Sequence, residues 1–426
     1  MRRRTAQGAV AALVCLVATA PAAGAAEPAV VERRVALMGT ELRLAVEAAD
    51  RAAALAASEL AVAAVEAAEA RLSTWRDDSE LARLHAAPAG KPFPLSPELA
   101  AELGAALACA EATGGAFDPT LGAVAAAWGL RRGGRQPAAG ELAAARAASG
   151  ASLLAVADGR AVRRHPGLAV DEGGFGKGAG IAAAVAALAA DGRAGRAVLD
   201  FGGQVTVWTR RPGEAEEDAA GFHHGLLGVA DPRERGSVAA RLSIDGGSVA
   251  TSGNGERGIV AGGLRRGHLL DPRTGEPAPD RGSVTVWVAD RAPVPGAAGL
   301  GPAAHALFAD CLSTGLYVLG PEAALAWASR WPGIEILVLA PDGRGGVAGR
   351  ASAGWAGRLE AVGERVRIDV QPRGTMDDAA LRAAARSPGE ETRAAVATLA
   401  GSGPSALPNP SPQGSPRGAG SEEEYR

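Results

Sequence analysis

The sequence predicts one α+β domain, in which strands and helices mix without a regular β-α-β alternation. Near the N-terminus, two segments of alternating apolar residues (30–37 and 41–46) precede a long alanine-rich segment with helical spacing (52–71). Further along, short apolar runs lead into glycine turns, a pattern typical of strands. The chain shows no internal repeat. We therefore expect a single domain over residues 27–365.

Local signals mark the first elements. The two alternating segments form strands joined through Met38-Gly39-Thr40, where the glycine indicates a turn or a bulge. After the long helix, Ser79 can cap a second helix. The run Ser96-Pro97-Glu98 begins a third helix, because serine is a good N-cap and proline is tolerated at the first helical position. This helix is expected to carry Cys109 on its buried face and to end near 113–115.

The second half of the chain is expected to contain several strands and one helix, which precedes the last strand. Apolar runs that end in glycine or proline turns predict strands over 198–203, 204–208, 226–230, 284–288 and 334–339. An apolar helix opens at 309–315, before the last of these strands.

Composition and the N-terminus indicate an exported protein. The 426 residues carry a formal net charge of −3 and only 4% aromatic residues, so nothing indicates bulk nucleic-acid binding. A basic start (2–4), an apolar core (8–20) and a small-residue cleavage site (23–25) predict a signal peptide over 1–26 and a soluble protein of the periplasm or cell envelope. Cys109 and Cys311 then remain; one disulfide is possible, but buried single cysteines are the preferred interpretation.

The C-terminal part differs in composition from the rest. Beyond about residue 370 the alternation of apolar and polar residues degrades, and 402–426 is rich in proline, serine and glycine, with three consecutive glutamates. Such a composition cannot bury enough apolar surface to order the chain. We expect residues 366–426 to be a largely disordered extension.

One glycine-rich stretch has the pattern of a phosphate site. The apolar run 167–170 leads into Asp171-Glu-Gly-Gly-Phe-Gly-Lys-Gly-Ala-Gly180, followed by an alanine-rich helix over 179–190. Glycines let the backbone approach a ligand, and a helix N-terminus attracts anions. Neither the Walker loop nor the Rossmann fingerprint fits the spacing. Plain turns show similar clusters, but Lys177 is one of only two lysines in the chain and supplies a compact cation.

Eight segments in order resemble one known family. They are Met38-Gly-Thr40, Ser79-Glu-Leu81, Gly115-Ala-Phe-Asp-Pro-Thr120 with Trp128-Gly129, Asp171 to Gly178, Gly202-Gly203, Ala250-Thr-Ser-Gly253 with Glu256-Arg257, His268 with Asp271-Pro-Arg-Thr-Gly275, and Ala309-Asp310 with Ser313-Thr314. Together they resemble the ApbE family of FAD:protein FMN transferases over about 35–340. The resemblance implies a T-fold-like domain of mixed sheets and helices.

The resemblance also implies site residues. Asp310 and Thr314 match side-chain ligands of Mg²⁺, and Gly174 matches a backbone-oxygen ligand. The residues implied to bind FAD are Met38, Trp75, Ala116, Phe117, Asp118, Asp171, Lys177, His268 and Leu269. Taken by itself, Asp310 also fits an ordinary acid at a helix N-terminus, and Trp75 also fits a core tryptophan.

The sequence departs from the family pattern at four places. Glu172 stands where an apolar residue is usual, Gly255 where a tyrosine is usual, and His85 where asparagine is common. The loop 292–304 is longer than in typical members. None of these removes a residue matched to the metal or the phosphates, although loss of the tyrosine is expected to loosen flavin or partner recognition.

The activity implied is Mg²⁺-dependent transfer of FMN from FAD to a Thr or Ser hydroxyl of a target protein, with release of AMP. The implied target is an exported or membrane-anchored subunit of an electron-transfer system. His268 and Asp310 are the candidates that accept the hydroxyl proton. Three alternatives stay open: a hydrolase that splits FAD into FMN and AMP, a non-catalytic FAD-binding protein, and an exported binding domain without flavin.

Overall fold

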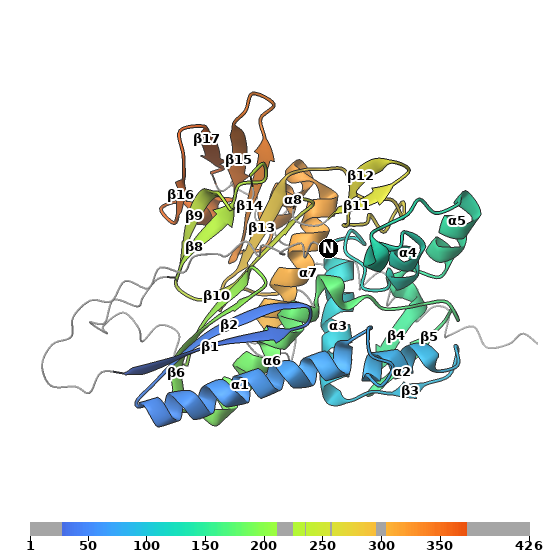
Figure 1. Cartoon of the computed structure of the whole chain (residues 1–426), viewed down its shortest axis with the longest axis horizontal. Coiled ribbons are helices and arrows are strands. Elements are labelled where there is room, and N and C mark those ends of the chain that lie inside the picture. The colour runs from blue at the N-terminus through green and yellow to red at the C-terminus, as the bar shows by residue number, and fades with distance from the viewer. Residues whose placement is uncertain (1–27, 211–224, 235, 256–257, 295–303, 373–426) are drawn as a thin grey trace, which may run out of the picture. The chain divides into compact units, whose positions relative to one another are not determined.

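A large sheet forms the centre of the protein (Figure 1). The computed structural model describes residues 28–210, 225–234, 236–255, 258–294 and 304–372. Several expectations lie outside this part of the chain. They are the signal peptide (1–26), most of the predicted extension (373–426), most of the long loop (295–303) and the matched pair Glu256-Arg257.

Within the described residues, nine strands form the large sheet, and all its neighbours are antiparallel except the last pair, β15 and β17. In sheet order they are β1 (Ala29–Leu37), β2 (Thr40–Ala48), β6 (Ala194–Phe201), β7 (Gln204–Thr209), β10 (Gly247–Gly253), β13 (Ser283–Val288), β14 (Ile334–Pro341), β15 (Val347–Ala351) and β17 (Val366–Val370). The domain end expected at residue 365 falls before β17, so the sheet continues beyond it.

Three smaller sheets complete the β structure that is described. The first contains β8 (Gly225–Ala230), β9 (Val238–Ile244) and β16 (Leu359–Ala361); the second contains β3 (Phe93–Pro94), β4 (Leu154–Ala157) and β5 (Arg160–Arg163); the third is the hairpin of β11 (Gly258–Ala261) and β12 (Leu264–Gly267).

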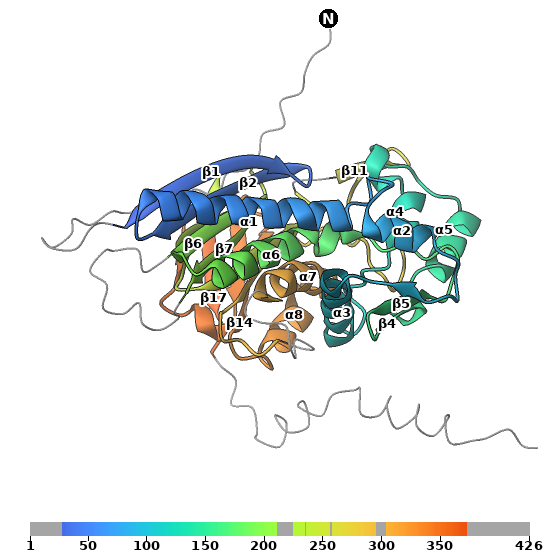
Figure 2. The ribbon, with the colours of Figure 1, turned by 90° about the horizontal axis from the view of Figure 1, so that it is seen from below.

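Eight α-helices belong to the described part of the chain. They are α1 (Arg51–Leu72), α2 (Glu80–Ala86), α3 (Pro97–Ala112), α4 (Gly122–Ala127), α5 (Ala139–Ala147), α6 (Gly176–Asp191), α7 (Ala304–Leu319) and α8 (Pro321–Ala328). Figure 2 shows α1, α6 and α7 side by side, and each of them contacts strands of the large sheet. No helix among the described residues is long and apolar enough to cross a membrane.

Both faces of the central strands are buried. On β13, Val284 and Val286 pack in the core that contains α3 and α7, whereas Trp287 packs in the core shared with β8 and β9. Alternate residues of β14 divide in the same way, with Ile336 toward the helices and Leu337 toward the small sheet. Because successive side chains of a strand point to opposite faces, two-sided burial produces the apolar runs seen in the sequence.

The predicted signals at the first elements are confirmed. Met38 and Gly39 connect β1 to β2 with φ of 46° and 71°, so the hairpin has a two-residue turn with two left-handed residues. Ser79 accepts a hydrogen bond from the Ala82 N–H at the start of α2. Ser96 accepts one from the Leu99 N–H at the start of α3, where proline is the first residue. The mixed α+β architecture predicted from the sequence is therefore confirmed.

Two helix starts differ from the prediction. Helix α6 begins at Gly176 rather than at residue 179, so Lys177 lies in its first turn and not in a loop. Helix α7 spans Ala304–Leu319, so Asp310 lies inside the helix and is not an acid of its N-terminal turn. Apolar periodicity did not reveal these starts, because glycine and small apolar residues surround both of them.

Buried single cysteines are confirmed for the described residues. Cys109 on α3 and Cys311 on α7 are both free and both buried. Burial raises the pKa of the Cys311 thiol well above its ordinary value, and the neighbouring Cys109 adds to this shift. The thiol form is therefore strongly favoured inside this core.

Helices α6 and α7 approach each other at Gly178. A Cβ added to this residue would lie 2.5 Å from the Ala306 carbonyl oxygen and 2.6 Å from the Leu307 Cα. These are backbone atoms, which cannot rotate away as a side chain does. The absence of a side chain at Gly178 is therefore a condition for the contact between the two helices.

We predict that Gly178→Ala lowers the free energy of unfolding by about 1–3 kcal/mol, because the extra methyl group forces the two helix backbones apart. The matched control is Gly104→Ala in α3, where an added Cβ meets nothing within 4 Å. That change is expected to be neutral or stabilising by up to about 1 kcal/mol, since alanine favours helix over glycine. Urea denaturation of the two variants is the measurement, and equal stabilities would contradict the prediction.

Candidate functional site

The N-terminus of α6 is capped by a carboxylate from α7. Phe175 precedes α6 and provides no side-chain cap. In its place, Asp310 Oδ2 accepts a hydrogen bond from the Gly178 N–H at 3.0 Å, and Asp310 Oδ1 lies 3.0 Å from Lys177 Nζ. Asp310 is only 5% exposed. A buried carboxylate is stable only when paired, and here an ammonium group and a backbone donor pair with it.

Oxygen atoms gather one helical turn further along α7. Thr314 lies four residues after Asp310, so both side chains are on the same face of the helix. Ser252, near the end of β10, lies 3.2 Å from the Thr314 hydroxyl and 2.8 Å from that of Ser313, measured between oxygen atoms. A Cβ added to Gly174 would lie 3.7 Å from Thr314 Oγ1. The structure thus brings Gly174 beside Thr314.

The oxygen atoms of this site are of the type that binds a hard cation with further ligands from outside the protein. Asp310 and Thr314 offer side-chain oxygens, and Gly174 offers a carbonyl nearby; these are the donor types that Mg²⁺ prefers. The described residues contain no group of three or more His, Cys, Asp or Glu side chains that could hold a metal ion. If a metal ion bound here, its remaining coordination positions would be taken by water or by phosphate oxygens of a ligand.

The segment before α4 is built into the core. Thr113 Oγ1 accepts the Phe117 N–H at 3.1 Å, and both Ala116 and Phe117 are buried. An added Cβ on Gly315 of α7 would lie 2.9 Å from Phe117 Cβ, so this glycine lets the segment lie against the helix. Ala116 and Phe117 thus line the core side of the site and expose little side-chain surface.

Asp118 and Asp171, both predicted to bind FAD, organise the surrounding backbone. Asp118 Oδ1 accepts hydrogen bonds from the Thr120 N–H and hydroxyl at 2.8 and 2.6 Å, and its Oδ2 accepts the Ala151 N–H at 2.9 Å. Asp171 Oδ1 accepts the Gly173 N–H at 2.9 Å. These carboxylates shape the loops of the site, a role that the sequence interpretation did not assign.

Met38 lies over α6. Its backbone N–H donates to Glu69 Oε1 at 2.9 Å, and its Cε would lie 3.4 Å from a Cβ added to Gly180. Gly180 follows Lys177 by less than one helical turn. The β1–β2 turn therefore contributes a side chain near the N-terminal end of α6.

Trp75 is not a core residue. Its side chain lies in the connection between α1 and α2 and is 71% exposed. The alternative of a core tryptophan is therefore wrong. A large aromatic ring left in water is free to stack on a planar ligand.

His268 and Leu269 follow β12 and are half-buried. The Leu269 N–H donates to Asn254 Oδ1 at 3.4 Å, and the Leu269 carbonyl accepts the Ala278 N–H at 2.8 Å. Asn254 comes two residues after Ser252. The loop of His268 is thereby held at the end of β10 from which Ser252 reaches Thr314.

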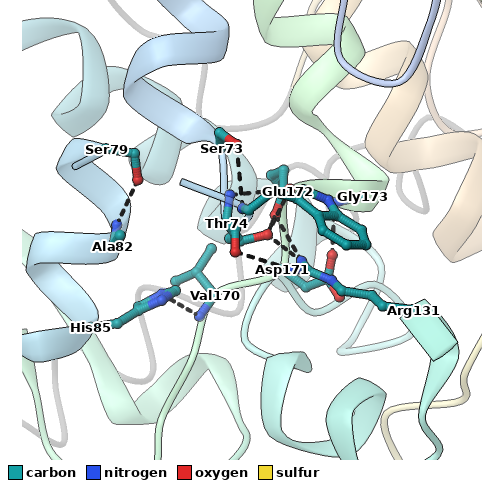
Figure 3. Close-up of polar contacts among 11 residues, drawn as sticks. Ser73, Thr74, Ser79, Ala82, His85, Arg131, Val170, Asp171, Glu172 and Gly173 are labelled. Carbon is teal, nitrogen blue, oxygen red and sulfur yellow. Dashed lines mark hydrogen bonds and ion pairs between the residues drawn. The ribbon is translucent and has the colours of Figure 1, made fainter. Parts of the chain in front are cut away.

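Two residues outside the predicted set support the glycine-rich loop (Figure 3). His85 Nε2 accepts the Val170 N–H at 2.9 Å, just before Asp171. The Glu172 carboxylate binds the Thr74 hydroxyl, which lies 2.7 Å from each carboxylate oxygen. Both positions were noted in the sequence only as departures from a family pattern. Ser252 was likewise inside a matched motif but had no assigned role.

Comparison with known proteins gives a consistent result. The profile described as the ApbE family matches residues 38–338. The FAD:protein FMN transferase of Treponema pallidum is 31% identical over 308 residues, which are 70% of this chain and 80% of that protein. The protein of the same name from Klebsiella pneumoniae is 31% identical over 340 residues, 78% of this chain and 89% of that protein.

Solved structures agree with the described fold. The apo form of the flavinyl transferase ApbE of Pseudomonas stutzeri superposes with a TM-score of 0.61 at 25% identity, covering 76% of this chain and 95% of that one. The ApbE protein of Thermotoga maritima gives a TM-score of 0.61 at 26% identity, covering 73% and 94%.

The His85 contact generates a pH prediction. Burial, and then the positive charges of Arg163 and Arg131, lower the pKa of His85 from 6.5 to about 4. Between these values the unfolded chain binds more protons at this residue than the folded protein does. The contribution of neutral His85 to the free energy of unfolding is therefore fully present above pH 6.5 and is lost as the pH falls through 4.

We predict that the wild type loses up to about 3 kcal/mol more stability between pH 7 and pH 4 than His85→Gln, which cannot titrate. Urea denaturation at both pH values measures this difference, and the common effects of other groups cancel in the comparison. Parallel pH profiles for the two proteins would contradict it.

Proposed function

The chain belongs to the ApbE family, and from this we propose that it is an FAD:protein FMN transferase that depends on Mg²⁺. FAD is the substrate, and the FMN half is transferred to a Thr or Ser hydroxyl of a target protein. The proposal depends mainly on Asp310. Its carboxylate is buried against Lys177 and the Gly178 N–H in the first turn of α6, and it lies on the same face of α7 as Thr314.

The proposed reaction is a displacement at phosphorus. The target hydroxyl oxygen bonds to the phosphorus of the FMN half, the bond from that phosphorus to the bridging oxygen breaks, and AMP leaves with that oxygen. The hydroxyl proton must also be removed. Such transfers depend mainly on positioning and on charge neutralisation, since the attacking and leaving oxygens must be in line.

Residues of this chain supply these functions. Asp310, Thr314 and the Gly174 carbonyl would hold Mg²⁺, which when bound neutralises charge on the phosphate oxygens. Lys177 provides a second, compact positive charge at the N-terminus of α6. Trp75 offers a ring for stacking. The oxygens of Asp310 are already engaged by two donors, which favours His268 as the group that accepts the hydroxyl proton.

The location and the partner are part of the same proposal. The basic and apolar start of the sequence supports export to the periplasm or cell envelope. A target in that compartment would be an exported or membrane-anchored electron-transfer subunit with an accessible Thr or Ser. The near-neutral charge of the chain does not favour a nucleic acid as partner.

A transfer assay tests the proposed function. The chain without residues 1–26 is incubated with FAD, MgCl₂ and an exported Thr-containing candidate domain, and the products are separated by denaturing gel and nucleotide chromatography. We expect a fluorescent target band together with AMP. Free FMN with AMP and no labelled target, for every candidate domain tried, would instead identify an FAD hydrolase. Intact FAD in every case would identify a binding protein.

Two variants separate the proposed roles of Asp310 and His268. Asp310→Asn should lower AMP release roughly 10²–10³-fold, the range for loss of one contact to transition-state charge, and added Mg²⁺ should not stabilise this variant against heat. His268→Gln should lower the rate about 10²-fold while its stabilisation by Mg²⁺ with FAD is unchanged.

The control for these two variants is Asp78→Asn, an exposed carboxylate paired with Arg76. It should keep full activity. Undiminished transfer by Asp310→Asn would overturn the assigned metal site, and undiminished transfer by His268→Gln would overturn the assigned base.

A further inference from the structure

Four side chains form a connected cluster at the edge of the candidate site, named here the Glu172 cluster: Thr74, Trp75, Arg131 and Glu172. They come from three separate segments of the chain: the connection between α1 and α2, the 3₁₀ turn Leu130–Arg132, and the turn Glu172–Gly174 of the glycine-rich loop. Figure 3 shows Thr74, Arg131 and Glu172 pointing toward one another.

Arg131 is placed against the indole of Trp75. Its guanidinium carbon lies 4.6 Å from the centroid of the ring, and Nη1 donates to the Thr74 carbonyl at 3.1 Å. A guanidinium over an indole face is attractive, because the face carries negative charge density. One face of the indole is thus occupied by a cation, while the side chain as a whole stays 71% exposed.

Glu172 fixes the position of that arginine. Arg131 Nη2 lies 3.6 Å from Glu172 Oε2 and also donates to the Thr74 hydroxyl. The same hydroxyl lies 2.7 Å from both oxygens of Glu172. The cluster is therefore a chain of contacts that runs from the glycine-rich loop through Thr74 and Arg131 to the indole.

Folding alone gives little reason for this arrangement. The side chain of Glu172 is only 18% exposed, and the neighbouring residue in the chain is a second acid, Asp171. At the other end, a tryptophan side chain remains in water. Burial of an acid opposes folding, and an indole that stays in water contributes little to it. A planar ligand that covers the free face of the indole would remove this apolar surface from water.

We propose that Glu172 is a positioning residue which, through Thr74 and Arg131, orients Trp75 as an aromatic wall for a planar ring of bound FAD. The inference rests on the proposed function, because it takes FAD as the ligand. It adds Arg131, Thr74 and Glu172 to the residues that determine FAD affinity, although none of them touches the reacting phosphorus. Their effect is on binding and not on the rate of the bound complex.

Equilibrium binding of FAD without a target protein is the primary test, measured by quenching of flavin fluorescence. We expect about tenfold weaker binding for Trp75→Ala, the scale of one lost stacking contact. Arg131→Ala and Thr74→Val should weaken binding about threefold to tenfold. Thr74→Ser keeps the hydroxyl and should bind FAD as the wild type does. Arg76→Ala, which removes a neighbouring arginine paired with Asp78, is the matched control and should also be normal.

If these residues act by positioning Trp75, two further results are expected. The double variant Trp75→Ala/Arg131→Ala should bind FAD no more weakly than Trp75→Ala alone, because Arg131 acts through the indole. At saturating FAD, kcat of the single variants should stay within about twofold of wild type while KM for FAD rises, the pattern of lost uniform binding.

The outcomes distinguish the proposed function from the inference about the Glu172 cluster. Normal FAD binding and AMP release by the wild type, with unchanged affinity in Arg131→Ala and Thr74→Val, would overturn the inference alone. Additive effects of Trp75→Ala and Arg131→Ala would overturn it as well. A wild-type chain that does not bind FAD would overturn the proposed function and this inference together.

Discussion

The close contact of α6 with α7 at Gly178 is the constraint on which the candidate site depends. Because this residue has no side chain, the first turn of α6 comes within hydrogen-bonding reach of Asp310 on α7. The same contact brings Lys177 to the other oxygen of that carboxylate. One steric condition therefore positions a cation, a buried anion and a helix N-terminus around a single point.

The scaffold around this point is packed on both faces of the large sheet. The central strands are buried on both faces, by the helices on one side and by the small β8–β9–β16 sheet on the other. Ser252 at the end of β10 links this framework to Thr314, and Gln204 on β7 donates to the Ala306 carbonyl of α7 at 2.6 Å. Polar groups buried in this way fix helix α7 against the sheet.

The loops that surround the site are held by polar side chains in addition to the core that they share. His85 holds the backbone at Val170, Asp118 holds the turn before α4, and Glu172 holds Thr74. Each bond joins segments far apart in the sequence. This explains how a site composed largely of glycine-rich backbone keeps a defined shape, since glycine by itself favours no single conformation.

The sequence by itself determined the mixed α+β class, the first hairpin, the capped starts of α2 and α3, and the family, because hydrophobic alternation, serine caps and motif order are local properties. Only the tertiary structure decided that Lys177 and Asp310 lie inside helices, that Asp118 bonds to the protein, and that Trp75 is exposed with Arg131 behind it. These depend on contacts between residues separated by tens to more than a hundred positions. No local pattern encodes them, since they arise only when the packed helices and sheet bring distant side chains together.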